Sequence, residues 1–391
     1  MVWKPALLVA LAALGAACGE ATPPGAVTVT DSAGIRIVVS HAPVWSGEHA
    51  WRISQEPVLE IGGIAEGDQL LHDVRDIDRL SDGRWVVTHT GSSELRLYAP
   101  GGDFLESIGR EGQGPGEFTF PTATWVTGGD SLVVREFQRV SVLGSDGAFA
   151  RSSPASPWPP QDRFQDGTFL FTVVPPGLDT FEPGYSRPDQ ALVRAQADGS
   201  EADTLRIVEG TERYRFQSSA GGVSSHFAPF GTTRTAVVGG GDVYTTAGRT
   251  FEVVVLDGTG TVRSILRRTV QAETVTDRHV QALESAILES APDRTHPDRR
   301  RMFLEWSYPD EMPVIDRLAV DAEGHLWVRA YSATPRTERE WSVMSAEGHW
   351  LGQVVTPAAF EVMEIGPDYI AGVHVDGLGV EHVQVFRLER T

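Results

Sequence analysis

The sequence predicts an all-β chain, and three observations support that prediction. Glycine and proline are frequent, with 41 and 24 of 391 residues, which indicates many tight turns between short elements. An acidic or glycine turn followed by an apolar, β-rich run recurs six times. A second unit, in which a turn ending in glycine joins two strands, follows five of these copies. Together the two units make four short strands per repeat, which predicts a six-bladed β-propeller of four-stranded blades.

The two repeat units are recognised by their turn residues. The six copies of the first unit start at Asp82, Asp130, Asp166, Gly241, Glu323 and Asp368. The glycines of the second unit are Gly102, Gly147, Gly199, Gly260 and Gly348. Glycine supplies the positive φ that such turns require, and aspartate favours the start of a turn. We therefore expect these residues to join neighbouring strands within each blade.

The sixth blade is incomplete at the C-terminal end, because the chain stops at Thr391 soon after the strand-like run 383–388. The segment from Gly34 to Ser40 is a strand without a blade of its own. We expect this N-terminal strand to complete the sixth blade, close the ring and remove an open sheet edge.

A helical insertion interrupts the β pattern at 274–306. Val280, Leu283, Ile287 and Leu288 fall at helical spacing, and Thr276 or Asp277 can cap the start of the helix. Pro292 ends this helix, and residues 298–306 form a second short one. We expect the insertion to pack over one face of the ring.

The N-terminus has the features of an export signal. Residues 1–17 combine Lys4 with a short apolar run and small residues before Cys18, the single cysteine. This arrangement resembles a bacterial lipobox, although Gly15 replaces the usual leucine, and it implies a lipid on Cys18. The alternative is an ordinary secretory peptide cleaved after Ala17. Residues 18–27 form a flexible tether, and 28–391 form the propeller.

The charge limits the partners of the chain. The formal net charge is −20, so the surface repels phosphate backbones and anionic lipid head groups. We therefore expect no nucleic-acid partner and membrane attachment through the lipid anchor alone. The residues after Cys18 lack the aspartate typical of inner-membrane retention, which favours the outer membrane, with the domain on its periplasmic or surface face.

One stretch resembles a known repeat. The segment 96–109, followed by GREGQGPGEF at 109–118, is similar to an NHL-type propeller repeat. The mature chain resembles the bacterial six-bladed β-propellers of the TolB-like and NHL-like kind, many of which are exported lipoproteins. This resemblance implies a fold rather than a reaction, because propellers host many unrelated functions.

Common catalytic motifs are absent from the sequence, including G-x-S-x-G and H-E-x-x-H. Ligands of propellers usually bind near the central channel, so the candidate ligand-binding residues are polar residues just before the repeated turns. They are His72, Asp73, Arg75, Asp76, Arg163, Arg234, Asp316, Arg317 and Glu364.

Two functions are consistent with these residues. The first is an envelope-anchored binding or scaffold module without a cofactor, whose partner is an envelope protein or peptide. The alternative is a Ca²⁺-dependent hydrolase or lactonase, or an NHL-type lyase, in which carboxylates converging on the channel hold Ca²⁺ as they do in lactonase and arylesterase propellers. Arginine pairing of these carboxylates would argue against the enzyme, and the missing motifs favour the binding module.

Overall fold

The fold was analysed in a computed structural model, which describes residues 25–45, 47–63, 70–177, 182–219, 221–290, 296–333 and 337–390. The predicted leader, Cys18, most of the tether and Pro292 lie outside these residues. Within the described ranges, none of the helices combines the length and the apolar character that a membrane crossing needs.

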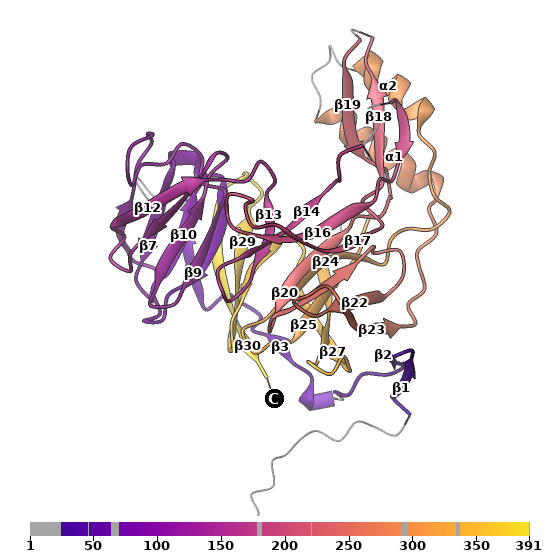
Figure 1. Cartoon of the computed structure of the whole chain (residues 1–391), viewed down its shortest axis with the longest axis horizontal. Helices are drawn as coiled ribbons and strands as arrows, with labels where there is room; N and C mark the ends of the chain where they lie inside the picture. The colour runs from indigo at the N-terminus through magenta and orange to yellow at the C-terminus, as the bar shows by residue number, and fades with distance from the viewer. Residues whose placement is uncertain are drawn as a thin grey trace, which may run out of the picture.

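Seven sheets account for nearly all the regular structure (Figure 1). In the first three, four antiparallel strands follow one another in chain order. The first contains β5 (Val74–Arg79), β6 (Trp85–His89), β7 (Glu94–Tyr98) and β8 (Phe104–Ile108). The second contains β9 (Ala123–Thr127), β10 (Ser131–Arg135), β11 (Arg139–Leu143) and β12 (Phe149–Pro154). The third contains β13 (Pro160–Arg163), β14 (Phe169–Val173), β16 (Gln190–Ala195) and β17 (Asp203–Val208).

The next three sheets repeat this order, and two of them gain strands from the N-terminal segment. The fourth contains β20 (Thr235–Gly239), β21 (Asp242–Thr246), β22 (Glu252–Leu256) and β23 (Val262–Arg268), extended by β2 (Ile35–Ser40) and β1 (Val27–Ser32). The fifth contains β24 (Ile315–Val320), β25 (Leu326–Ala330), β26 (Glu338–Met344) and β27 (Trp350–Pro357). The sixth contains β28 (Phe360–Ile365), β29 (Tyr369–Val375) and β30 (Glu381–Glu389), joined by β3 (Arg52–Ile53) and β4 (Leu59–Gly62).

The repeated turns lie where the sequence predicts them. Each copy of the first unit joins the first and second strands of a sheet, and each glycine of the second unit joins the third and fourth strands of the first five sheets. All five of these glycines have positive φ, from 74° at Gly147 to 91° at Gly102. Their lack of a Cβ makes this backbone accessible without strain.

Hydrophobic clusters link the first six sheets in sequence. One cluster lies between each successive pair from the first sheet to the sixth, and another lies between the sixth sheet and the first. At the last junction, the Trp85 ring packs edge-on against Tyr369 with 5.3 Å between ring centroids. At the junction of the second and third sheets, Trp125 packs in the same way against Phe169 at 5.1 Å. This architecture is of the β-propeller type.

The N-terminal strand does not complete the C-terminal sheet, contrary to the expectation from sequence. The segment Ile35–Ser40 forms β2, which runs parallel to β23 in the fourth sheet and buries Val38 completely. The sixth sheet is completed instead by β3 and β4, which run antiparallel to β30. The physical reason is connectivity: β4 lies shortly before β5, so pairing β4 with β30 places the chain beside the first sheet through a short connection.

Two helices and a seventh sheet form a projecting module at the top right of Figure 1. This three-stranded sheet contains β15 (Gly184–Ser186), β18 (Arg213–Gln217) and β19 (Val223–Phe227). The helices are α1 (Asp277–Glu289) and α2 (His296–Glu305), and Thr276 with His279 forms a capping box at the start of α1. Tyr214 and Phe216 of the sheet pack against Met302 and Phe303 of α2. The insertion therefore packs on this extra sheet rather than directly over the ends of the other sheets. Two 3₁₀ turns, Gly47–His49 and Thr90–Ser92, complete the regular elements.

Candidate functional site

The first strands of four sheets carry a bulge at the equivalent position. In β5, β13, β24 and β28, the pairing with the second strand shifts by one residue. A bulge leaves one residue unpaired and re-aims its neighbours. The residues that follow the bulged positions are Asp76, Asp162, Arg317 and Glu364. Asp76 interacts electrostatically with Arg317 and Asp162, and Glu364 with Asp76, so these four side chains converge. Three of the predicted site residues, Asp76, Arg317 and Glu364, are thereby brought together.

Asp76 and Asp162 each link two neighbouring sheets. Asp76 accepts hydrogen bonds from its own strand at Ile77 N (3.0 Å) and from β9 at Thr124 N (3.1 Å). Asp162 accepts from Arg163 N (2.7 Å) and from β20 at Val238 N (2.7 Å). Burial nevertheless raises the pKa of Asp76 to about 6. Because both oxygens of each carboxylate already accept backbone hydrogen bonds, the two residues primarily hold adjacent sheets in register.

An arginine–carboxylate network joins the fifth and sixth sheets. Arg329 Nε lies 2.7 Å from Asp316 Oδ1, and Arg329 Nη1 lies 3.0 Å from Glu361 Oε1. Arg317 pairs with the same Glu361 carboxylate. The predicted residues Asp316 and Arg317 are thus engaged with partners inside the protein.

Asp78 and Glu364 form the most perturbed acidic pair. Burial raises the pKa of Glu364 to about 7, although the Tyr369 hydroxyl donates to Glu364 Oε1 at 2.8 Å. Burial, reinforced by Asp76 and Glu364, raises the pKa of Asp78 well above its usual range. Among the described residues, Asp78 Oδ2 and Glu364 Oε2 are buried without a hydrogen-bond partner. Each of the two acids therefore has an oxygen that can still accept a hydrogen bond or carry a proton.

Nowhere in the described ranges do three or more His, Cys, Asp or Glu side chains come together in a group that could hold a metal ion. The two central aspartates Asp76 and Asp162 accept backbone amides, and Asp316 and Glu361 pair with arginine. No cofactor is assigned.

The remaining predicted residues lie apart from this centre. His72 is exposed, and its backbone N–H donates to His89 Nε2 at 2.9 Å. Asp73 pairs with Arg75 at 2.7 Å on a partly exposed surface. Arg163 lies over the Phe169 ring, with 5.9 Å from Cζ to the centroid. Arg234 donates to Glu209 O at 2.7 Å and lines a separate hollow beside the fourth sheet. Sequence position alone does not bring these residues to one site.

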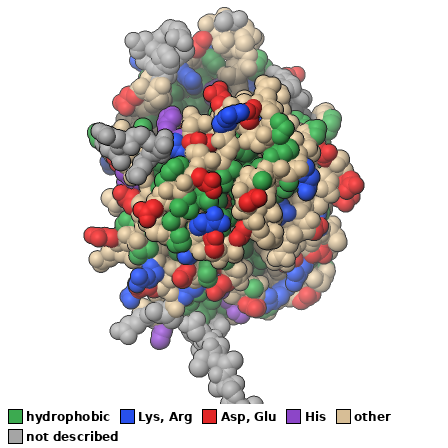
Figure 2. Space-filling model, turned by 90° about the vertical axis from the view of Figure 1, so that its left-hand side faces the viewer, with side chains coloured by type: hydrophobic (Ala, Val, Ile, Leu, Met, Phe, Trp, Pro, Cys, Tyr) green, Lys and Arg blue, Asp and Glu red, His purple; other side chains and the backbone are tan. Residues whose placement is uncertain are grey.

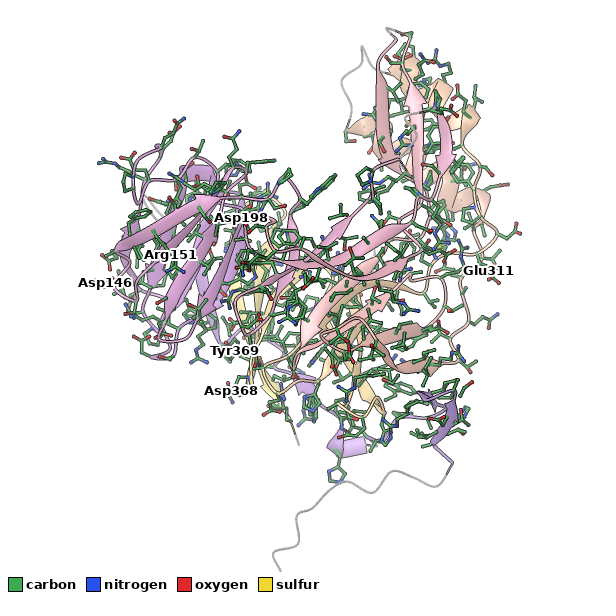
Figure 3. The ribbon with its side chains drawn as sticks, in the orientation of Figure 1. Asp146, Arg151, Asp198, Glu311, Asp368 and Tyr369 are labelled. Atoms are coloured by element: carbon green, nitrogen blue, oxygen red, sulfur yellow. The ribbon has the colours of Figure 1, made fainter. Side chains whose placement is uncertain are left out.

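The two ends of each sheet differ in character. Short turns join the first to the second and the third to the fourth strand, so antiparallel order places the longer connections at the opposite end, named the connection side. Figure 3 shows Asp146, Asp198 and Asp368 at three of the short turns. Exposed aromatic side chains are confined to the connection side in the described ranges, and they are Phe120, Phe137, Trp158, Tyr185 and Phe227. Longer connections with exposed apolar side chains are where binding is most often found.

The first two sheets carry one shallow hollow on this side. Phe120 and Phe137 lie there with 6.1 Å between ring centroids, next to the ion pair of Glu136 and Arg139. Figure 2 views the molecule from the left-hand side of Figure 1 and shows acidic and basic side chains intermixed around a group of hydrophobic side chains. The charges of this surface are therefore mixed in sign rather than uniformly acidic.

A pocket of about 620 Å³ lies beneath the projecting module. Its walls come from α1, α2, the segment 226–230 at the end of β19 and just beyond it, and the segment 331–333 after β25. Most of its lining is apolar, and the lining residues are His226, Phe227, Ala228, Pro229, Phe230, Ala282, Leu283, Ala286, Ile287, Arg299, Met302, Trp306, Tyr331, Ser332 and Ala333. Pockets of about 300–1,000 Å³ with apolar walls and a few polar groups are typical of small-molecule sites.

The sequence indicates parts of this pocket without predicting the pocket. The apolar face of α1 is visible from residue spacing, and Leu283 and Ile287 belong to it. None of the residues of α1 is fully buried, although the helix is amphipathic, because this face borders the pocket. The apolar run 227–230 is likewise visible, but its contact with α1 arises only when two distant connections meet.

Comparisons with known proteins show a similarity of fold. No protein-family model matches the chain, and no curated protein matches it in sequence. A member of the DUF4221 family from Bacteroides vulgatus is 9% identical, with a TM-score of 0.50 over 88% of this chain and 100% of that one. A protein from Bacteroides fragilis is 12% identical, with a TM-score of 0.49 over 90% of this chain and 99% of that one.

Enzymes also occur among the similar structures. A gluconolactonase from Xanthomonas campestris is 12% identical, with a TM-score of 0.40 over 86% of this chain and 100% of that one. These structural neighbours are β-propeller-type proteins. At such identities the likeness concerns the fold alone, and the chain shares the β-propeller type of architecture.

Proposed function

We propose that this chain is an exported, lipid-anchored binding module built on a closed six-bladed β-propeller, with its ligand site in the pocket beneath the projecting module. The six clusters between successive sheets support a closed ring, because the last of them joins the sixth sheet to the first. Pairing of β4 with β30 supplies the closing strand. The TolB-like and NHL-like resemblance belongs to the same proposal.

One observation carries the choice of the pocket over the channel. The central acids Asp76, Asp162, Asp316 and Glu361 are engaged by backbone amides and arginines, whereas the pocket presents an apolar surface that the described residues leave uncovered. Leaving apolar surface exposed to water is unfavourable, and a ligand that covers it gains the corresponding free energy.

A neutral fluorescent probe tests the pocket. The mature chain is titrated with N-phenyl-1-naphthylamine, whose emission increases in apolar surroundings. Ala286 lines the pocket and is exposed, so Ala286→Trp fills it with little effect on the core. Ser285→Trp on the same helix is the control, because Ser285 is exposed and does not line the pocket. Binding by the wild type and the control, and none by Ala286→Trp, is expected. Equal binding by all three chains would place the site elsewhere.

The lipid anchor is tested separately. Cys18→Ser is expected to abolish metabolic labelling with palmitate and to move the protein from the detergent phase to the aqueous phase. Labelling that persists in this variant would contradict the anchor.

We further propose that the protein lies at the outer membrane, on the periplasmic or surface face, and that its macromolecular partner is an envelope protein or peptide. Crosslinking of the anchored protein checks that partner.

A second candidate function is a hydrolase, lactonase or lyase at the channel. It is favoured by the two buried, unpartnered oxygens of Asp78 and Glu364, because burial raises the pKa of Glu364 to about 7 and that of Asp78 well above its usual range. The test is lactone hydrolysis by the mature chain with and without added Ca²⁺, repeated with Glu364→Gln. Activity lost in that variant but kept in Ala286→Trp would favour the channel over the pocket.

A further inference from the structure

The pocket beneath the projecting module has an unusual charge composition for this protein. The chain contains 53 Asp and Glu residues, yet none of the described residues that line the pocket is acidic. The lining contains one guanidinium, that of Arg299, among mostly apolar and aromatic side chains. Such a lining disfavours a cationic ligand, because it offers no carboxylate to pair with a buried positive charge.

Arg299 is available to pair with a ligand. No carboxylate of the described residues lies within ion-pair distance of its guanidinium, and the side chain is half-buried. It is close enough to His226 to help burial lower the pKa of that imidazole. His226 is therefore neutral at pH 7 and is hydrogen-bonded to the Ser224 hydroxyl at 2.8 Å. The positive charge in this pocket is thus that of Arg299.

Trp306 provides a second unused donor. Its indole Nε1–H is buried and has no hydrogen-bond partner among the described residues, and Trp306 lines the same pocket. A buried donor without an acceptor is unfavourable. The charged donor Arg299, with no carboxylate in the lining, matches the hydrogen-bonding needs of a carboxylate ligand.

The surroundings determine how such a ligand would lie. The segment 331–333 lines both the pocket and a second hollow, whose charged lining residues are Asp316, Glu338, Arg339 and Glu340. Carboxylates outnumber the one guanidinium in that hollow, so an anionic group is favoured on the Arg299 side. The apolar part of the ligand then lies along Leu283 and Ile287 of α1 and against Phe227 and Phe230.

We infer that the pocket binds a monoanionic amphiphile, with a carboxylate held at Arg299 and an aliphatic or ring body against the apolar walls. This inference rests on the proposed function, since it specifies the ligand class of the same pocket. An anionic ligand would otherwise be repelled by a protein whose net charge is −20, so the local positive charge of Arg299 is what makes this ligand class possible.

Three twelve-carbon probes with different head groups test the ligand class. Laurate, dodecanol and dodecyltrimethylammonium are titrated into the mature chain as monomers, and binding is followed by calorimetry and tryptophan fluorescence. We expect laurate to bind most tightly and dodecyltrimethylammonium least. Arg299→Gln should weaken laurate binding by about tenfold or more, as expected for loss of a hydrogen bond to a charged group, and leave dodecanol binding within about twofold.

Arg300→Gln is the matched control, because Arg300 is the exposed neighbour on the same helix and does not line the pocket. It should leave laurate binding unchanged. Laurate binding that survives Arg299→Gln, or equal binding of the cationic probe, would overturn the anionic class. If dodecanol still binds and Ala286→Trp abolishes that binding, the pocket remains the ligand site and only the ligand class is wrong. If no probe binds, or Ala286→Trp has no effect on binding, both proposals fail.

Discussion

Replacing Ile61 with alanine should destabilise the junction between the sixth and first sheets by about 3 kcal/mol. Ile61 lies on β4, opposite Val383 of β30, and only 3% of it is exposed. It packs with Trp85 and Tyr369 in the cluster that joins the two sheets. Removing three buried carbons costs about 2.4 kcal/mol at about 0.8 kcal/mol each. The cavity that remains adds to this, within the range of about 2–5 kcal/mol for such substitutions.

Urea unfolding of the mature chain measures this effect, with tryptophan fluorescence as the signal. Val58→Ala is the control, because Val58 lies just before β4 but is 53% exposed, and it should change stability by no more than about 0.5 kcal/mol. Hydrogen exchange locates the change: Ile61→Ala should accelerate exchange in β30, whereas Val38→Ala should do so in β23. A cost below about 1 kcal/mol for Ile61→Ala, or faster exchange of β30 in Val38→Ala instead, would refute closure by β4.

Three further predictions concern charge and backbone. Burial raises the pKa of Glu364 from 4.5 to about 7, so the folded state holds this proton more tightly than the unfolded state. The stabilisation that this proton gives the folded state is lost as pH rises through 7, and Glu364→Gln has no such proton to lose. Thermal melts should therefore show the variant gaining stability relative to wild type between pH 5 and pH 8, and a difference in melting temperature that does not change with pH would contradict this. Arg329→Gln leaves Asp316 without its arginine and Glu361 with Arg317 alone, and should lower the free energy of unfolding by about 1.5–3 kcal/mol, the range for hydrogen bonds to charged groups. The exposed Arg52→Gln should lower it by at most about 1 kcal/mol, and equal costs in urea unfolding would contradict the network. Gly260 and Gly241 share a φ of 88°, but a Cβ at Gly260 would lie 2.0 Å from Leu205 O and one at Gly241 meets nothing within 4 Å. Gly241→Ala should therefore lower the free energy of unfolding by about 1–2 kcal/mol, and Gly260→Ala should lower it by clearly more. Equal melting temperatures for the two variants would contradict the close approach of Gly260 to Leu205.

Local patterns in the sequence were sufficient to locate most strands and turns. The acidic and glycine turns predict where the strands of each sheet meet, because positive φ and turn-starting side chains are properties of a few adjacent residues. The helix after Thr276 was predicted from the spacing of Val280, Leu283 and Ile287 in the same way. The strand that completes the sixth sheet was mispredicted, because the segments 35–40 and 59–62 look equally suitable from their local sequence. Only the packing of Val38 and Ile61 in different hydrophobic clusters distinguishes the two strands.

The candidate sites were predicted less completely, for a related reason. Asp76, Arg317 and Glu364 were chosen from their positions before the repeated turns, and bulges in their strands bring them together. His72 and Arg234 also precede repeated turns but lie elsewhere, because they stand just before the first strands of their sheets rather than within them. The pocket at Arg299 was not predicted, since its walls come from connections that are far apart in the chain.

The sequence by itself determined the β character of the chain, its repeats, its turns and its acidic charge, all of which depend on composition and short-range spacing. The tertiary structure alone decided which N-terminal strand joins which sheet, which central acids are already engaged, and where apolar surface stays uncovered. These features depend on contacts between residues that are distant in the chain, and such contacts are selected by packing and connectivity rather than by local residue preference.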